Sequence, residues 1–407
     1  MRLRTSLVLV AAMLAVTMAA CEGAAPTDRS TPSPSPTGSP GGVTGRPVAT
    51  GPAVYARVAA GSLSAQARLA RPLVYVPNAR SNDVQVIDPR TYRVVSRFAV
   101  GREPQHVVPS WDLKTLWVND DLGNDLVPID PRTGRPGPKV RVDDPYNLYF
   151  TPDGKHALVM AERLRRIDVR DPRTMRLQRS IKVPCAGVNH ADFTADGSWL
   201  LASCEFSGAL LVVPLSLDRV SGVINLNGIA TPGAMDPAKA RATGSPARSL
   251  QRGASAMPQD VRITNDGRSF IVADMLRGGV WVVDVATRKV STFVPTGKGA
   301  HGIYPSRDAK RLFVTNRDAA SVSVLDATGR KVIAVWRLPR GASPDMGGLN
   351  VDGSELWLSG RYDGVVYVIA TSNGRLLHTI KVGSGPHGLL VWPQPGAHSL
   401  GHTGNMR

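Results

Sequence analysis

The chain has 407 residues, of which 40 are Gly and 32 are Pro, a combined share of roughly 18% against about 12% in average proteins. So many turn formers exclude a helical bundle, while 42% hydrophobic and 20% charged residues exclude disorder for most of the chain. The net charge is +17, but the basic residues form no run and only 5% of residues are aromatic. We therefore expect no specific nucleic-acid binding.

Residues 1–20 are predicted to be a lipoprotein signal peptide. Arg2 and Arg4 precede an apolar run from Leu7 to Val16, which is too short to span a bilayer and is typical of a secretory leader. The sequence Met18-Ala-Ala-Cys21 resembles a bacterial lipobox, which implies lipidation of Cys21 and a place on the outer face of the cytoplasmic membrane. Secretion without a lipid, or a periplasmic location, is the alternative.

Residues 21–54 are rich in Pro, Ser, Thr and Gly and contain almost nothing apolar to bury. This composition predicts a flexible tether without a site.

An internal repeat organises the rest of the chain. Pro104-Gln-His-Val-Val-Pro-Ser followed by Leu116-Trp-Val-Asn-Asp returns as Ala300-His-Gly-Ile-Tyr-Pro-Ser followed by Leu312-Phe-Val-Thr-Asn. One residue at the start of each inner strand marks each repeat, and these anchors are His106, Asn147, His190, Asp260, His301, Asp345 and His387. Their spacings of 41, 43, 70, 41, 44 and 42 residues indicate seven units, one of them with an insertion.

Each unit offers four short alternating strands, which predicts an all-β, seven-bladed β-propeller over residues 71–393. The last anchor supplies only an inner strand, and three outer strands precede the first anchor. The two ends of the chain should therefore share one clasp blade. Residues 394–407 follow as a C-terminal tail, where we expect His398 and His402 to lie on the surface rather than to act as ligands.

The repeat resembles the YVTN-repeat β-propellers over about four fifths of the chain. The resemblance rests on Val74-Tyr-Val-Pro-Asn, Phe313-Val-Thr-Asn and Val382-Gly-Ser-Gly-Pro-His-Gly-Leu. It implies the fold but no activity, because such propellers include binding and surface proteins as well as enzymes. The architecture also resembles the copper-binding propeller of nitrous oxide reductase and the haem-binding propeller of nitrite reductases, whose ligand motifs have no match here.

Four of the eight histidines occupy anchor positions around one mouth of the central channel: His106, His190, His301 and His387. Together with Asp260, Asp345 and Asn147 they are candidate ligands for a divalent metal such as Zn, Cu or Fe. The alternative is that Pro-His-Gly is a repeat consensus whose His bonds neighbouring backbone in a turn. Only His387 and His106, on adjacent blades, are expected to approach each other.

The ends of the second strands should form a polar rim around the same mouth. The predicted rim comprises Asn78, Asp120, Glu162, Glu205, Asp274, Arg317 and Arg361.

Two further features fall on this face. Cys185 and Cys204 both lie in the third blade, and an exported protein favours a disulfide between them; the alternative is a thiolate pair that completes a metal site beside His190 and Glu205. An insertion at about 225–257, rich in Gly, Ala, Pro and Arg, is interpreted either as a lid or as a surface insertion.

No serine-nucleophile elbow, Walker loop, His-Glu-x-x-His or dinucleotide fingerprint is present in the right structural context. The sequence thus favours a monomeric, lipid-anchored propeller that binds a small molecule, a polymer or a protein through its His/Asp-rich mouth. The alternative is an enzyme at the same mouth, either a metal-dependent redox enzyme using Cu, Zn or Fe or a hydrolase or lyase of the propeller type.

Overall fold

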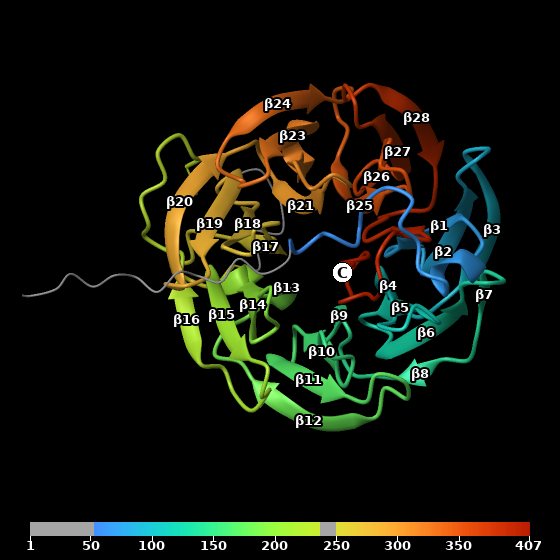
Figure 1. The fold of residues 1–407 in the computed structure, drawn as a ribbon, viewed down its shortest axis with the longest axis horizontal. Coiled ribbons are helices and arrows are strands. Elements are labelled where there is room, and N and C mark those ends of the chain that lie inside the picture. Colours follow the sequence, from blue (N-terminus) through green and yellow to red (C-terminus); the bar gives the residue numbers. More distant parts are fainter. Residues whose placement is uncertain (1–52, 237–249) are drawn as a thin grey trace, which may run out of the picture. The chain divides into compact units, whose positions relative to one another are not determined.

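Alternating apolar and polar residues build antiparallel sheets, and the computed structural model arranges seven of them in a ring (Figure 1). It describes residues 53–236 and 250–407. The predicted all-β, seven-bladed propeller is confirmed. The signal peptide with Cys21, the tether up to residue 52 and residues 237–249 of the insertion lie outside the described residues.

Helical structure is limited to single turns in this part of the chain, among them η1 (Ala67–Leu69), η2 (Glu205–Ser207) and η4 (Arg317–Ala319). Within residues 53–236 and 250–407, no helix has the length and apolar character needed to cross a membrane.

We number the blades from the first anchor. Strands are given from the channel outwards. Blade 1 contains β4 (Pro104–Pro109), β5 (Leu116–Asp120), β6 (Asp125–Asp130) and an outer strand split into β7 (Arg135–Pro136) and β8 (Val140–Arg141). Blade 2 contains β9 (Asn147–Phe150), β10 (Ala157–Ala161), β11 (Arg166–Arg170) and β12 (Leu177–Lys182), and blade 3 contains β13 (Val188–Phe193), β14 (Trp199–Cys204), β15 (Ala209–Pro214) and β16 (Gly222–Asn225).

Blades 4 to 6 repeat the same order. They contain β17 (Pro258–Ile263), β18 (Ser269–Asp274), β19 (Gly279–Asp284) and β20 (Lys289–Pro295); β21 (Ala300–Pro305), β22 (Arg311–Asn316), β23 (Ser321–Asp326) and β24 (Val332–Arg337); and β25 (Pro344–Leu349), β26 (Glu355–Gly360), β27 (Val365–Ala370) and β28 (Leu376–Lys381).

Blade 7 joins the two ends of the repeat region. Its inner strand β29 (Leu390–Trp392) pairs with β1 (Leu73–Asn78), which is followed by β2 (Asp83–Asp88) and β3 (Arg93–Ala99). The predicted clasp is therefore confirmed, and it removes the open sheet edges that the first and last repeats would otherwise present.

Apolar side chains between neighbouring blades form the core. Inner strands such as β4 and β13 are buried along their whole length, whereas the outer strand β3 is exposed at nearly every residue. Side chains of one inner strand also bond the backbone of the next blade. For example, the Ala191 N–H donates to the Tyr149 hydroxyl at 2.9 Å, and the Gly347 N–H donates to the Tyr304 hydroxyl at 2.7 Å.

A β-bulge at the anchor position turns five of the anchors towards the channel. The pairing of the inner and second strands shifts register at His106, His190, Asp260, His301 and Asp345. A bulge bends the strand and re-aims the side chain of its extra residue. The bulges therefore explain how an anchor on a strand directs its side chain to the axis of the ring.

The C-terminal tail fills the channel instead of lying on the surface, and the C-terminus lies near the centre of the ring (Figure 1). The inner edge of β9 offers unpaired backbone groups, and the tail pairs with them: the His402 N–H donates to Leu148 O at 2.9 Å and the Phe150 N–H donates to Leu400 O at 3.0 Å. At the end of the tail, Arg407 Nη2 donates a hydrogen bond to Asp192 Oδ1 at 2.7 Å.

Candidate metal centre

Five histidines meet in the channel: His106, His190, His301, His387 and His402. None is more than 2% exposed. Four of them are the predicted anchors, and the structure brings all four together rather than only His387 and His106. The fifth, His402, was expected on the surface, and this prediction was wrong because the tail pairs with β9 and carries the ring into the channel.

Neighbouring rings are close enough to share an ion. The ring centroids of His106 and His402 lie 5.1 Å apart, those of His190 and His402 4.9 Å apart, and those of His106 and His387 5.0 Å apart. One nitrogen of each of His106, His190 and His402 lies within 4.8 Å of the others. Inward motion of about 1 Å would bring such a trio to the Zn–N or Cu–N distances of roughly 2.0–2.1 Å.

Two of the rings, those of His106 and His387, are held by a hydrogen-bond acceptor at Nδ1. His106 Nδ1 lies 2.9 Å from Tyr146 O, and His387 Nδ1 lies 2.7 Å from Asp345 Oδ2, whose other oxygen lies 3.1 Å from His301 Nδ1. These partners are acceptors, so Nδ1 carries the proton and Nε2 keeps a free lone pair. Nε2 of His106, His190, His387 and His402 is buried, and no hydrogen-bond partner lies within the described residues. Orienting Nδ1 in this way is the usual role of outer residues around a metal.

Asn147 holds the other two rings. Its amide nitrogen lies 3.2 Å from His190 Nδ1 and 3.0 Å from His402 Nδ1, while its Oδ1 accepts the Leu148 N–H at 2.9 Å. In this orientation the amide donates to Nδ1 of both rings, so the ring proton of each histidine lies on Nε2. Rotating the amide by half a turn gives up the Leu148 bond, accepts two imidazole N–H groups and frees both Nε2 lone pairs for a metal.

The two predicted carboxylate ligands lie behind the histidines. Asp260 Oδ1 accepts from Arg262 Nη1 at 2.9 Å, its Oδ2 accepts the Ile303 N–H at 2.9 Å, and Oδ1 lies 3.9 Å from His402 Nε2. Asp345 is shared by His387, His301 and Arg317. Both carboxylates therefore support the site and its neighbouring strands, and the group of ligand atoms close enough to share an ion consists of His106, His190 and His402.

Burial sets the charge of the cluster. Removal from water lowers the pKa of His106 to about 4, and it lowers the pKa values of His190, His301, His387 and His402 well below their usual range. The five rings are thus neutral at pH 7, which is the form that binds metal ions.

The rim is displaced by one residue from its predicted position in three blades. Asn78, Asp120 and Asp274 are the last paired residues of β1, β5 and β18, equivalent to Ala161, Cys204, Asn316 and Gly360 in the other blades. The next residue in each blade forms the true circle, which consists of Ala79, Asp121, Glu162, Glu205, Met275, Arg317 and Arg361. Polarity alone does not reveal strand register, so Asp121 and Met275 were missed.

The three displaced residues fasten turns instead. Asp120 Oδ2 accepts the Gly101 N–H at 2.7 Å, and Asp274 Oδ1 accepts the N–H groups of Met257, Leu276 and Arg277 at 2.9–3.1 Å. Asn78 Nδ2 donates to Asp83 at 2.7 Å.

Charge on the rim is divided between opposite blades. Asp121, Glu162 and Glu205 lie on blades 1 to 3, whereas Arg317 and Arg361 lie on blades 5 and 6. Burial raises the pKa of Asp121 and of Glu205 to about 7, and that of Glu162 well above its usual range. The acidic side is therefore only partly ionised at neutral pH.

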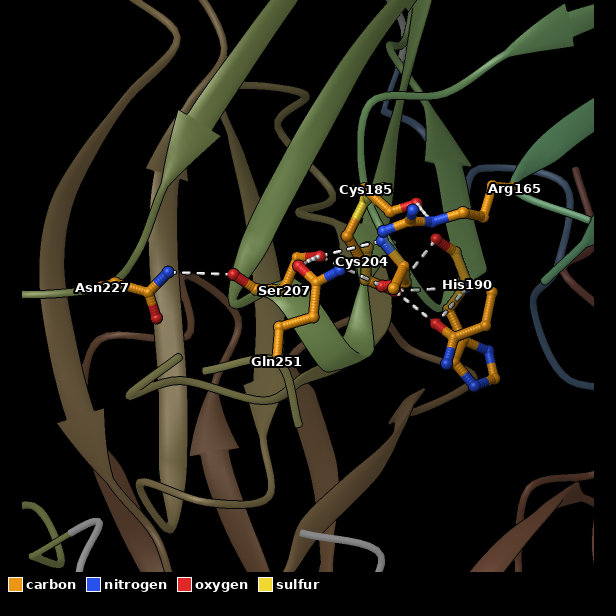
Figure 2. The surroundings of a disulfide bond; sticks show 10 residues. Arg165, Cys185, His190, Cys204, Ser207, Asn227 and Gln251 are labelled. Atoms are coloured by element: carbon orange, nitrogen blue, oxygen red, sulfur yellow. Dashed lines mark hydrogen bonds between the residues drawn. A yellow bond between two sulfur atoms is a disulfide. The ribbon is translucent and has the colours of Figure 1, made fainter. Parts of the chain in front are cut away.

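Cys185 and Cys204 form a disulfide, with Cα atoms 6.1 Å apart, beside His190 (Figure 2). Cys204 occupies the turn position that Asp120 and Asp274 hold in other blades, and Cys185 lies in the loop that precedes β13. The disulfide thus joins the same two segments that Asp120 joins through Gly101. Neither sulfur is a free thiolate, so the cysteines do not contribute metal ligands.

The flanks of the insertion pack against the turns of blades 3 and 4. Leu226 and Ala256 are fully buried, the Gln251 N–H donates to Phe206 O at 2.8 Å and the Met235 N–H donates to Arg277 O at 3.0 Å. The segment between these flanks lies outside the described residues, so its interpretation as a lid stays a prediction.

Comparison with known proteins supports the fold. A family model described as YNCE-like beta-propeller matches residues 41–216 and 235–397. No curated protein sequence gives a significant match.

Solved structures extend this likeness. A functionally unknown protein from Desulfotomaculum acetoxidans has a TM-score of 0.61 and 14% identity over 80% of this chain and 100% of that one. Kuenenia stuttgartiensis hydrazine synthase has a TM-score of 0.53 and 17% identity over 69% of this chain and 87% of that one. The dihydro-heme d1 dehydrogenase NirN in complex with DHE has a TM-score of 0.55 and 14% identity over 81% of this chain and 77% of that one. At these identities the likeness extends to the fold alone.

Proposed function

The chain belongs to the YNCE-like β-propeller family, and we propose that it uses the centre of the propeller to bind a divalent transition-metal ion, copper or zinc. His106, His190 and His402 would hold the ion, with His387 beside them. The proposal is carried by one observation: one nitrogen of each of these rings lies within 4.8 Å of the others, and their Nε2 atoms are buried without a partner within the described residues. Nδ1 of His106 is bonded to Tyr146 O, and Nδ1 of His190 and of His402 contacts the Asn147 amide, whose rotation frees both Nε2 lone pairs.

The energetic reason is the cost of leaving polar atoms unpaired. A buried nitrogen without a partner costs about 1–3 kcal/mol, and within the described residues each of the five channel histidines carries one such atom. A metal ion satisfies several of them at once. A neutral nitrogen donor set suits copper and zinc, because imidazole binds both well and the three converging ligand atoms are histidine nitrogens.

The tail gives the site its third ligand, so the metal would also fix the C-terminus in the channel. Gly401 makes this possible: its φ of +103° favours glycine, and a Cβ there would lie 2.3 Å from Leu148 O. We further propose that the protein acts outside the cytoplasmic membrane as a lipoprotein, a location in which its disulfide would persist.

Metal content of the purified full chain tests the proposal. Protein stripped with a chelator, reloaded with Cu²⁺ or Zn²⁺ and desalted should retain about one ion per chain. His106→Gln, His190→Gln and His402→Gln should each lose it.

His156→Gln is the matched control, because His156 bonds Gln178 away from the channel. It should keep the ion. The proposal fails if the wild type retains no metal, or if the folded channel variants, checked by circular dichroism, retain as much metal as the control.

A further inference from the structure

One arginine on the rim carries a charge that no carboxylate balances. Arg361 follows β26 on blade 6, and its side chain makes one long hydrogen bond, from Nη1 to Gly385 O at 3.5 Å. Within residues 53–236 and 250–407, no Asp or Glu oxygen lies within 4.0 Å of its guanidinium nitrogens. Its neighbour on blade 5, Arg317, is fully paired.

The carboxylate that would serve Arg361 is already used. Asp345 Oδ1 accepts from Arg317 Nε at 3.0 Å and Nη2 at 2.5 Å, and Oδ2 lies 2.7 Å from His387 Nδ1. Asp345 thus neutralises Arg317 and orients the histidines. Burial lowers the pKa of Arg361, and Asp345 opposes this effect only from a distance.

The acidic side of the rim does not restore the balance. Glu205 accepts from Asn189 at 2.7 Å, and Glu162 Oε2 is buried without a partner within the described residues. A metal ion held by neutral histidines would add a double positive charge near Arg361, whose charge already acts on His387 and His106. Positive charge at the partly buried Arg361 and in the channel is costly unless an anion pairs with it.

We propose that the rim binds a small carboxylate that pairs with Arg361 and reaches the metal ion from the mouth of the channel. This inference rests on the proposed metal centre. A carboxylate fits because its two oxygens match the planar guanidinium fork. A three-histidine ion also leaves a coordination position for an added ligand, and Glu162 in its protonated form can donate a hydrogen bond to an oxygen of the ligand.

Titration of the Cu²⁺-loaded full chain with sodium formate tests this site. The copper absorption and EPR spectra of the wild type should change saturably, because formate enters next to the ion. Arg361→Gln should weaken formate binding about tenfold or more, the loss expected for a charge-assisted bidentate pair. The formate affinity of Arg361→Lys should lie between those of the wild type and Arg361→Gln.

Arg93→Gln, on the exposed outer strand β3, is the control and should bind formate like the wild type. Copper content is measured first for every variant and should be equal. A wild type that holds copper but shows no response to formate overturns the carboxylate site and leaves the metal centre standing. So does an Arg361→Gln variant with wild-type formate affinity. A wild type without copper overturns both.

Discussion

Two rings of polar residues come from the same repeat, one at the turns that end the second strands and one in the channel, and they differ in how the protein satisfies their polar atoms. At the turns, Asp274 accepts three backbone N–H groups and, at 2.8 Å, the Trp281 indole. In the channel, the Nε2 atoms of four histidines have no partner within the described residues. At the turns, only single oxygens such as Asn78 Oδ1 and Asp120 Oδ1 lack a partner within the described residues. In the channel, unpartnered nitrogens belong to rings that lie next to one another, so one ligand could satisfy several of them.

The disulfide strengthens this comparison. In blade 3 the turn position holds Cys204. Its disulfide to Cys185 stands where Asp120 of blade 1 accepts a hydrogen bond from the Gly101 N–H. The turn ring therefore tolerates different chemistry as long as the loop is fastened. The channel ring repeats one chemistry, imidazole, on four blades and adds it a fifth time from the tail.

The largest expected contrast is in stability. Asp274→Ala leaves four buried donors unpaired and should lower the free energy of unfolding by about 3–5 kcal/mol, at one or two kcal/mol each with partial relaxation. His190→Gln in the metal-free protein should lower it by less than about 1.5 kcal/mol, because little bonding of Nε2 is lost. Urea unfolding of both variants measures the difference. Equal losses would erase the distinction between the two rings.

Asn147 provides a sharper test within the channel. Asn147→Asp offers an acceptor to Nδ1 of both His190 and His402 and should keep or tighten metal binding. Asn147→Leu removes that support and should weaken it by about 10- to 100-fold, as for other outer residues of metal sites. Competition with a chelator gives the affinities. If both variants bind metal equally, orientation by Asn147 plays no part.

The smallest effect concerns the pH dependence of a turn. Burial raises the pKa of Asp120 to about 8, and the neighbouring Asp125 carboxyl raises it further. Because this pKa lies above the value of about 3.9 in the unfolded chain, stability present below pH 4 is lost as the pH rises towards 8. The Asp120→Asn side chain stays neutral. Between pH 4 and pH 8 the free energy of unfolding of the wild type should therefore drop by about 1–3 kcal/mol more than that of Asp120→Asn. Parallel curves in thermal unfolding from pH 4 to 8 would contradict this assignment.

The fold was accessible from the sequence because its determinants are local and repeated. Anchor spacings near 42 residues, alternating strands and turn residues predict blades, and the position of the last anchor predicts the clasp. The site was only half accessible. The histidines at anchors could be read from the repeat, but their convergence depends on bulges at residues such as His190 and His301, which no pattern of polarity reveals.

His402 was missed because tertiary pairing places it. The tail has no repeat signature, and only the flanking Gly401 and Gly404, both at positive φ, hint at a sharp turn that can present a side chain. The predicted rim was displaced at Asn78, Asp120 and Asp274 for another reason. A shift of one residue changes which side chain faces the mouth, and Asp120 and Asp121 are indistinguishable by type.

Anomalous diffraction at the metal absorption edge, from crystals of the full chain grown with Cu²⁺ or Zn²⁺, tests the central claim most directly. We predict one strong peak in the channel, about 2 Å from ring nitrogens of His106, His190 and His402. An empty channel, with peaks only at histidines outside it such as His156 or the exposed His378, would contradict the account.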